Sequence, residues 1–265
     1  MTRTRFLDLL TQKDRAVLGS WSQIDSADAV EVLAAGGFDF TIIDTEHTAF
    51  GLDRAQELLR AADACGLTAA VRVAAIDRTL VAKAVDAGAS AVVVPGIRTA
   101  EEVETVSGWM RFGGGGTRGA CPCVRATGQA VGDWATFAAD SDRQLLCLPL
   151  IETPEAVDSI EAIVSVEGLR CLILGPFDLS VAMGHSGATS ASEVKTVVRR
   201  VLDACKAAGV TPILPLFEPT PEALAHRMEE WREEGVRMFT LGTDKLLLAT
   251  IARALTCQAD KEETP

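Results

Sequence analysis

The sequence predicts a single (β/α)8 barrel, and three observations lead to that prediction. Short apolar runs bordered by Gly, Pro or charged residues have the composition of strands buried on both faces. Amphipathic segments alternate with them, and eight such units suit the length of about 250 residues typical of this barrel. No Pro-, Gly- or Ser-rich linker divides the 265 residues. An open doubly wound sheet is the alternative, because alternation cannot show that a sheet closes.

The expected strands are short and rich in Val, Ile and Leu. In chain order they are Ala16–Ser20, Phe38–Ile43, Thr68–Val73, Ala89–Pro95, Leu145–Ile151, Leu169–Leu174, Thr211–Leu216 and Val236–Leu241. The expected helices have one apolar face, and several begin at a Pro or end at a Gly, as first turns and C-caps do. They are Ala27–Ala35, Leu52–Cys65, Thr79–Ala87, Ala100–Met110, Pro154–Ser165, Ala191–Ala208, Pro221–Glu234 and Asp244–Leu255. We expect the barrel domain, with an extra N-terminal helix, over residues 1–259 and a polar tail over 260–265.

Charge and cysteine usage exclude several classes of protein. The net charge of −12 repels nucleic acid and anionic membranes, so neither is an expected partner. The N-terminal apolar run is broken by Asp8, and no apolar stretch approaches the roughly 20 residues of a membrane span, so we expect a cytoplasmic location. The seven cysteines are scattered, which favours reduced thiols. Cys121 and Cys123 lack the further ligands of a zinc site.

Polar residues gather where the expected strands end, which is the active-site face of a (β/α)8 barrel. In strand order these are Asp44, Glu46 and His47, then Arg72, Glu152, Gly175-Pro176-Phe177-Asp178, Glu218 and Asp244. Acids at the end of buried strands are unfavourable unless something uses them. Several acids with one His and one Arg are typical of a divalent-metal site that also binds an anionic substrate.

Individual roles follow from position. We expect His47 to be a general base oriented by Asp44, because both lie at one strand exit. Glu46 would be a supporting or subunit-contact acid. Glu152 and Asp178 could each simply cap a helix or turn, but as a pair on adjacent strands they have the pattern of metal ligands.

Two other mechanisms fit the sequence poorly. The glycine-rich segment 113–119 contains G-x-G-x-x-G, but it follows a helical stretch rather than a strand, so a dinucleotide cofactor is not expected. We expect instead a flexible loop over the barrel mouth, with Arg118 or Arg125 available to a substrate. A Schiff-base aldolase needs a Lys in the mouth, and only Lys245 follows a strand, where it opens the last helix.

Seven segments are similar to one known family. They are IDTEHTAF (43–50), VRV (71–73), VDAGASAVVVPGIRTAEE (85–102), TRGACPCVRA, LIETPEAV, VEGLRCLILGPFDLSVAMG and LGTDKLLL. Together they resemble the HpcH/HpaI aldolases, metal-dependent class II pyruvate aldolases that cleave 4-hydroxy-2-oxo acids. The similarity extends from about Gly19 to Leu255.

The resemblance implies a role for each matching residue. Glu152 and Asp178 would bind a divalent ion (Mg²⁺, Mn²⁺ or Co²⁺), with water completing the octahedron. His47 would pair with Asp44, and Arg72 would contact the substrate. Backbone amides of the turn formed by Gly175, Pro176, Phe177 and Asp178 would hold the pyruvate carboxylate. This chain departs from the family at Leu150, where many members have Gln, and in the Cys-Pro-Cys loop, which in the family helps to shape the aldehyde pocket.

The implied reaction is reversible cleavage of a 4-hydroxy-2-oxo acid to pyruvate and an aldehyde through a metal-stabilised enolate, with His47 accepting the C4 hydroxyl proton. Three alternatives remain: an oxaloacetate-type decarboxylase, a citryl- or malyl-CoA thioester lyase, and a non-catalytic metabolite-binding barrel. The resemblance also implies a homo-oligomer, a hexamer built as a trimer of dimers. Apolar surface for the contacts would come from Leu179, Val181, Met183 and residues 246–248.

Overall fold

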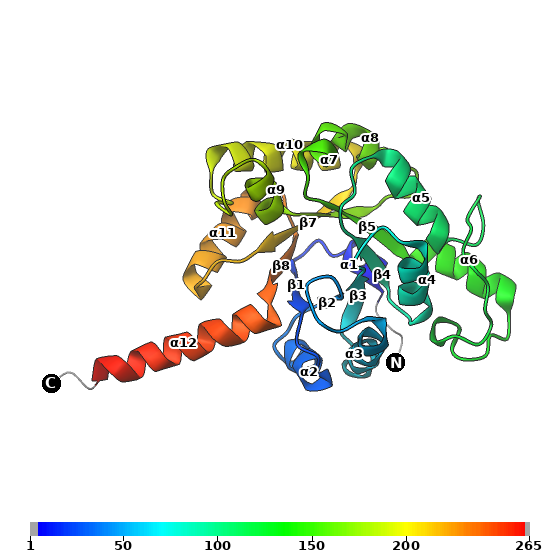
Figure 1. Cartoon of the computed structure of the whole chain (residues 1–265), viewed down its shortest axis with the longest axis horizontal. Coiled ribbons are helices and arrows are strands. Elements are labelled where there is room, and N and C mark those ends of the chain that lie inside the picture. Colours follow the sequence, from blue (N-terminus) through cyan, green and yellow to red (C-terminus); the bar gives the residue numbers. More distant parts are fainter. Residues whose placement is uncertain (1–4, 263–265) are drawn as a thin grey trace.

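Eight parallel strands close into a barrel in the order in which they occur in the chain (Figure 1). The computed structural model describes the backbone of residues 5–262 and the side chains of residues 5–256. Because β1 pairs with both β2 and β8, the predicted (β/α)8 barrel is confirmed and the open-sheet alternative is wrong. The strands are β1 (Val17–Ser22), β2 (Phe40–Asp44), β3 (Thr68–Arg72), β4 (Ala91–Val94), β5 (Leu146–Ile151), β6 (Cys171–Leu174), β7 (Thr211–Leu216) and β8 (Met238–Thr243).

Helices cover the outside of the barrel between successive strands (Figure 1). They are α1 (Phe6–Leu9), α2 (Ala27–Ala35), α3 (Leu52–Cys65), α4 (Arg78–Asp86), α5 (Ala100–Met110), the 3₁₀ turn η1 (Arg125–Thr127), α6 (Trp134–Gln144), α7 (Pro154–Asp158), α8 (Ile160–Val164), α9 (Pro176–Ala182), α10 (Ser192–Ala208), α11 (Pro221–Glu233) and α12 (Asp244–Glu262). The sequence prediction misses α6 and α9 and ends the last helix too early. The helix continues into the expected polar tail, of which residues 263–265 lie outside the described part.

Two apolar cores stabilise the barrel. One lies between the strands and the surrounding helices, and the other fills the barrel interior. The short helix α1 closes the N-terminal end, because Phe6 is fully buried and its ring meets that of Phe40 edge-on, with centroids 5.1 Å apart. Gly19 on β1 makes room for this contact, since a Cβ there would lie 2.3 Å from the Phe40 ring. With the N-terminal end filled, the open end is the one where the strands finish.

Helix α12 differs from the other helices in its direction. It begins at the end of β8 and runs away from the barrel rather than back along it (Figure 1). Its apolar residues Leu248, Ile251 and Leu255 are 64%, 54% and 62% exposed. In the described part of the chain, no helix has both the length and the apolar character needed to cross a membrane.

Candidate active site

The centre of the site is an ion pair between two neighbouring strands. Asp44 and Arg72 end β2 and β3 and lie opposite each other in register. Arg72 Nε donates to Asp44 Oδ1 at 2.9 Å and Nη2 donates to Oδ2 at 2.6 Å. Asp44 is fully buried and Arg72 is 7% exposed. The guanidinium also lies over the ring of Trp21 on β1, 4.4 Å from its centroid.

The Asp44 carboxylate has further donors. Gln23 Nε2 donates to Oδ2 at 2.8 Å, and the backbone amides of Glu46 and His47 donate to Oδ1 at 3.0 and 3.2 Å. Burial alone would raise the pKa of Asp44, but the hydrogen bonds and charge of Arg72, helped by Gln23 and the Glu46 amide, lower it below its ordinary value. Asp44 is therefore a fixed negative charge that orients Arg72.

This arrangement corrects one expectation. Asp44 contacts His47 through the backbone amide, and among the described residues no hydrogen bond joins it to the imidazole. The reason is register: Arg72 lies directly opposite and takes both carboxylate oxygens. The acid near the imidazole is Glu46, whose Oε2 lies 4.0 Å from His47 Nε2. The His47 side chain is 63% exposed, so it faces the open end of the barrel.

Glu46 connects the imidazole to Arg72. Its Oε2 lies 3.0 Å from Arg72 Nη1, in an alignment too poor for a hydrogen bond, which leaves that buried oxygen without a donor among the described residues. Burial raises the pKa of Glu46, and the charges of Asp44 and Asp178 add to the effect against the opposing influence of Arg72 and His47.

Glu152 and Asp178 come together from β5 and α9. Glu152 Oε1 accepts a hydrogen bond from the Gly96 amide at 2.7 Å. Burial, with further contributions from the charges of Asp178 and Glu46, raises the pKa of Glu152 to about 7. Neither acid is a helix cap: Thr153 caps α7, and α9 has no side-chain cap. The structural alternative for this pair is therefore not supported.

The residues present fit a divalent cation. Glu152 and Asp178 offer carboxylate oxygens, the ligands that hard divalent ions prefer, and a cation would relieve the repulsion that Asp178 and Glu46 exert on Glu152. Gly175 lets the backbone approach, because a Cβ there would lie 2.6 Å from Glu152 Cβ. No group of three or more His, Cys, Asp or Glu in the described residues could enclose an ion. Glu152 and Asp178 would therefore leave positions open for water or substrate.

The turn before Asp178 has fewer free amides than the resemblance implies. The Gly175 amide donates to the Ile151 carbonyl at 2.8 Å, which extends the β5–β6 pairing by one residue. Pro176 has no amide hydrogen. Phe177 and Asp178 stand in the first turn of α9, where amides have no partner within the helix. These two amides are the backbone donors that the turn can offer to a carboxylate.

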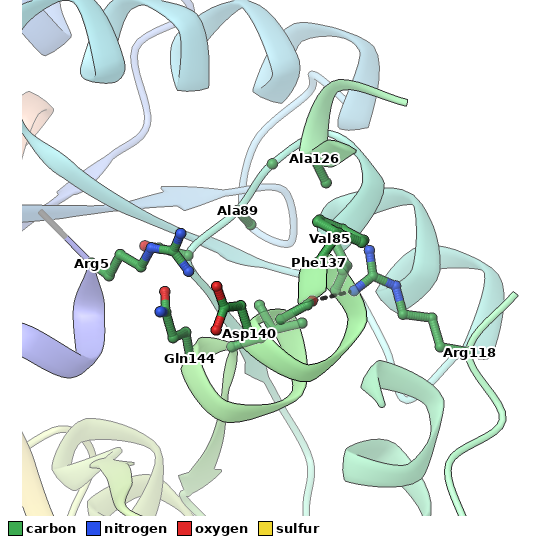
Figure 2. A pocket seen from close by; sticks show the side chains of 12 residues that line it. Arg5, Val85, Ala89, Arg118, Ala126, Phe137, Asp140 and Gln144 are labelled. Atoms are coloured by element: carbon green, nitrogen blue, oxygen red, sulfur yellow. Dashed lines mark hydrogen bonds between the residues drawn. The ribbon is translucent and has the colours of Figure 1, made fainter. Parts of the chain in front are cut away.

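The expected loop over the barrel mouth lies at the other end of the barrel. Arg118 lines a cavity of about 190 Å³ with Ala89, which lies two residues before β4 (Figure 2). Leu145, which immediately precedes β5, lines the same cavity. Its Nη1 donates to Ser141 Oγ at 2.8 Å and its Nη2 to Asp86 at 3.1 Å. Arg125 is similarly bound to Asp63 and to the Ala87 carbonyl. Helix α5 ends at this face, so within one chain neither arginine reaches the mouth.

Two further acids at strand ends have structural roles. Glu218, after β7, accepts a hydrogen bond from Arg227 Nε at 2.9 Å. Asp244, at the start of α12, accepts from the backbone amides of Gln23 and Ile24 at 2.9–3.0 Å. The sequence prediction had missed the contributions of Gln23, Trp21 and the Gly96 amide. Trp21 lies on β1 and Gln23 just after it, so their position at a strand end could have marked them as site residues. No feature of the neighbouring sequence marks Gly96.

The chain is similar to known proteins over most of its length. The sequence model described as HpcH/HpaI aldolase/citrate lyase matches residues 17–250. The chain is 28% identical over 256 residues to the 2-dehydro-3,6-dideoxy-6-sulfogluconate aldolase of Pseudomonas putida, covering 97% of both chains. It is 31% identical over 254 residues to a hydroxypyruvate/pyruvate aldolase of Delftia acidovorans, covering 93% of this chain and 91% of the relative.

Solved structures show the same relationship. A crystal structure of an HpcH/HpaI aldolase/citrate lyase family protein from Burkholderia cenocepacia superposes with a TM-score of 0.88 at 30% identity, covering 97% of this chain and 100% of that one. The relatives named above are aldolases, which are carbon–carbon lyases, and this chain is a carbon–carbon lyase as well. Because the family model matches residues 17–250 and the solved structure superposes over nearly the whole chain, the chain belongs to the HpcH/HpaI aldolase/citrate lyase family.

Proposed function

We propose that the protein is a class II pyruvate aldolase that reversibly cleaves a 4-hydroxy-2-oxo acid to pyruvate and an aldehyde. The observation that carries the proposal is the group of carboxylates beside one fixed guanidinium. Glu152 and Asp178 share a site in which the pKa of Glu152 is raised to about 7, and Arg72 is held next to it by Asp44. The clustered carboxylates can bind a cation that balances their charge, and the guanidinium can donate hydrogen bonds to an anionic oxygen of the substrate.

Glu152 and Asp178 would hold the ion, for which Mg²⁺, Mn²⁺ and Co²⁺ are the candidates. When bound, such an ion supplies Lewis-acid charge at the 2-oxo group of the substrate. Arg72 uses Nε and one Nη2 proton on Asp44, and Nη1 faces Glu46, so N–H groups remain on both terminal nitrogens for the developing oxyanion. The amides of Phe177 and Asp178 would receive the substrate carboxylate.

His47 would move the proton. In cleavage, the imidazole accepts the C4 hydroxyl proton, the C3–C4 bond breaks, and its electron pair forms the enolate of pyruvate, which is then protonated at C3. Glu46 lies close enough to favour the imidazolium that results. The exposed position of His47 would let aldehydes of different size reach it.

The test is a screen of the purified protein with pyruvate and a panel of aldehydes, read out by product mass, with and without added Mg²⁺, Mn²⁺ or Co²⁺. We expect adducts that require both the aldehyde and the divalent ion. Oxaloacetate is included as a substrate, because decarboxylation releases pyruvate without an aldehyde. Pyruvate release from oxaloacetate alone, with no adduct from any aldehyde, would contradict the aldolase proposal.

We also propose that the protein is a homo-oligomer, with a hexamer as the expected size. Support comes from α12, which leaves the barrel and exposes Leu248, Ile251 and Leu255. An apolar helix face of this kind is normally covered in a folded protein. Val32 on α2 is also 69% exposed and adds apolar surface.

A further inference from the structure

Gln23 lies between two buried acids and contacts both. Its backbone amide donates to both Oδ1 and Oδ2 of Asp244 at 3.0 Å, and the next amide, that of Ile24, donates to Oδ2 at 2.9 Å. Its side-chain Nε2 donates to Asp44 Oδ2 at 2.8 Å. Asp244 is 6% exposed and Asp44 is fully buried. One half-buried residue therefore bridges the start of α12 and the active-site ion pair.

The bridge acts on the oxygen that orients Arg72. Asp44 Oδ2 accepts from Gln23 Nε2 and also from Arg72 Nη2, at 2.6 Å. A shift of the Gln23 amide group thus changes the position of the carboxylate that fixes the guanidinium. The same strand end supplies a second contact, because Trp21 lies under the Arg72 guanidinium and is itself fixed by a 2.9 Å hydrogen bond from Nε1 to Thr240 Oγ1 on β8.

We propose that Gln23 is a positioning residue that couples the start of α12 to Arg72 through Asp244 and Asp44. The proposal rests on the proposed function, in which Arg72 stabilises the developing oxyanion. Gln23 does not need to touch the substrate for this role. It suits the role because a neutral amide can donate to Asp44 without competing with Arg72 for charge, and because its backbone is clamped at the same time.

The first experiment measures cleavage of the best 4-hydroxy-2-oxo acid by the metal-loaded enzyme carrying Gln23→Met. Met has a similar length but no donor. We expect kcat to fall about tenfold, equivalent to about 1.4 kcal/mol, with KM and divalent-ion affinity changed less than twofold. The matched control is Ser90→Ala. It removes a 2.6 Å hydrogen bond from Ser90 Oγ to the Ala69 carbonyl, at the opposite end of β3, and we expect it to leave kcat unchanged. A kcat for Gln23→Met within twofold of wild type overturns the proposal.

The second experiment tests the coupling with Asp244. We expect Asp244→Ala to lower kcat in the wild-type background and to have little further effect in the Gln23→Met background, because both changes break the same link. Asp244→Asn, which keeps an acceptor for the two amides, serves if the alanine variant does not fold, and it should give a smaller loss. Independent effects that multiply in the double variant would contradict the coupling.

A third measurement does not depend on turnover. In protein labelled with ¹⁵N at the arginine Nε, the Arg72 Nε–H signal is assigned by its loss in Arg72→Lys. The ring of Trp21 and the carboxylate of Asp44 both determine its chemical shift. We expect Gln23→Met and Asp244→Ala to move this signal and Ser90→Ala to leave it in place. If the signal moves but no aldol substrate is found, the proposed function has failed and the coupling stands. If the signal is unchanged in both variants, the coupling is refuted.

Discussion

Asp44 and Arg72 occupy matched positions at the ends of β2 and β3, and the guanidinium makes a two-bond fork onto the carboxylate with distances of 2.9 and 2.6 Å. Both residues are buried, and the two hydrogen bonds between them hold the guanidinium in one orientation. The positive charge of Arg72 is therefore already in place where an oxyanion would form, which is the preorganisation that electrostatic catalysis requires.

Arg72→Lys is expected to reduce kcat by more than about tenfold, because one ammonium cannot keep the fork with Asp44, face Glu46 and still offer a donor to the substrate. The measurement is steady-state cleavage at saturating divalent ion. An effect confined to KM would instead assign Arg72 to ground-state binding of the substrate.

Glu152→Gln and Asp178→Asn are each expected to abolish cleavage and to weaken Mn²⁺ binding by at least about tenfold, since each replaces a charged oxygen donor by a neutral one. Binding is measured by calorimetry and folding by circular dichroism. Glu218→Gln is the control, because Glu218 pairs with Arg227 and should not affect the ion. If either variant keeps a near-wild-type kcat in buffer that contains a metal chelator, these two carboxylates do not hold a catalytic ion.

Binding of the ion should release a proton in a pH-dependent way. In the metal-free protein the pKa of Glu152 is about 7, and only the carboxylate form binds the cation. At pH 6 most molecules carry that proton, so binding should release close to one proton, and at pH 8.5 the release should approach zero. Affinity should accordingly rise with pH up to about 7 and then level off. Calorimetry in buffers of different ionisation enthalpy measures the released protons, and a constant value across this range would contradict the prediction.

His47→Ala should lose cleavage while Mn²⁺ and pyruvate still bind, because the imidazole is 63% exposed and is not among the groups proposed to hold the ion or the carboxylate. Glu46→Gln should reduce the cleavage rate by less, because a neutral amide no longer stabilises the imidazolium. Pyruvate binding by calorimetry is measured alongside the cleavage rate. If His47→Ala cleaves at the wild-type rate, the base is a different group.

Assembly should depend on the exposed face of α12. We expect light scattering at micromolar concentration to show a homo-oligomer, and Ile251→Glu to reduce its mass, because a charge would be buried against the partner. Lys245→Gln, which also changes the net charge by −1 and lies at the exposed start of the same helix, serves as the control for net charge. A monomeric wild-type protein would refute the assembly proposal.

The sequence by itself determined the alternation of eight strands with helices and which strand ends carry the acids, whereas closure of the sheet into a barrel came from the tertiary structure. Apolar runs alternating with amphipathic segments can bury their apolar faces in few ways, and consecutive parallel strands end at the same face. Asp44 and Arg72, which end β2 and β3, and Glu152, which follows β5, therefore had to lie at the same face of the sheet. The helix α6 was missed although five of its eleven residues are apolar, because none of its residues is buried and it lacks the buried stripe that marks a core-facing helix.

Only the tertiary structure decided which partner each side chain takes. Asp44 could orient His47 or bind Arg72, and the register of β2 with β3, fixed by the closed barrel, selects Arg72. The loop with Arg118 could cover the mouth or lie at the opposite end, and the direction of α5 brings it to the opposite end, where Asp86 and Ser141 hold it. Hydrogen bonds depend on ångström distances between residues far apart in the chain, such as Gln23 and Asp244. Strand register and closure of the barrel determine those distances, and local sequence patterns do not encode them.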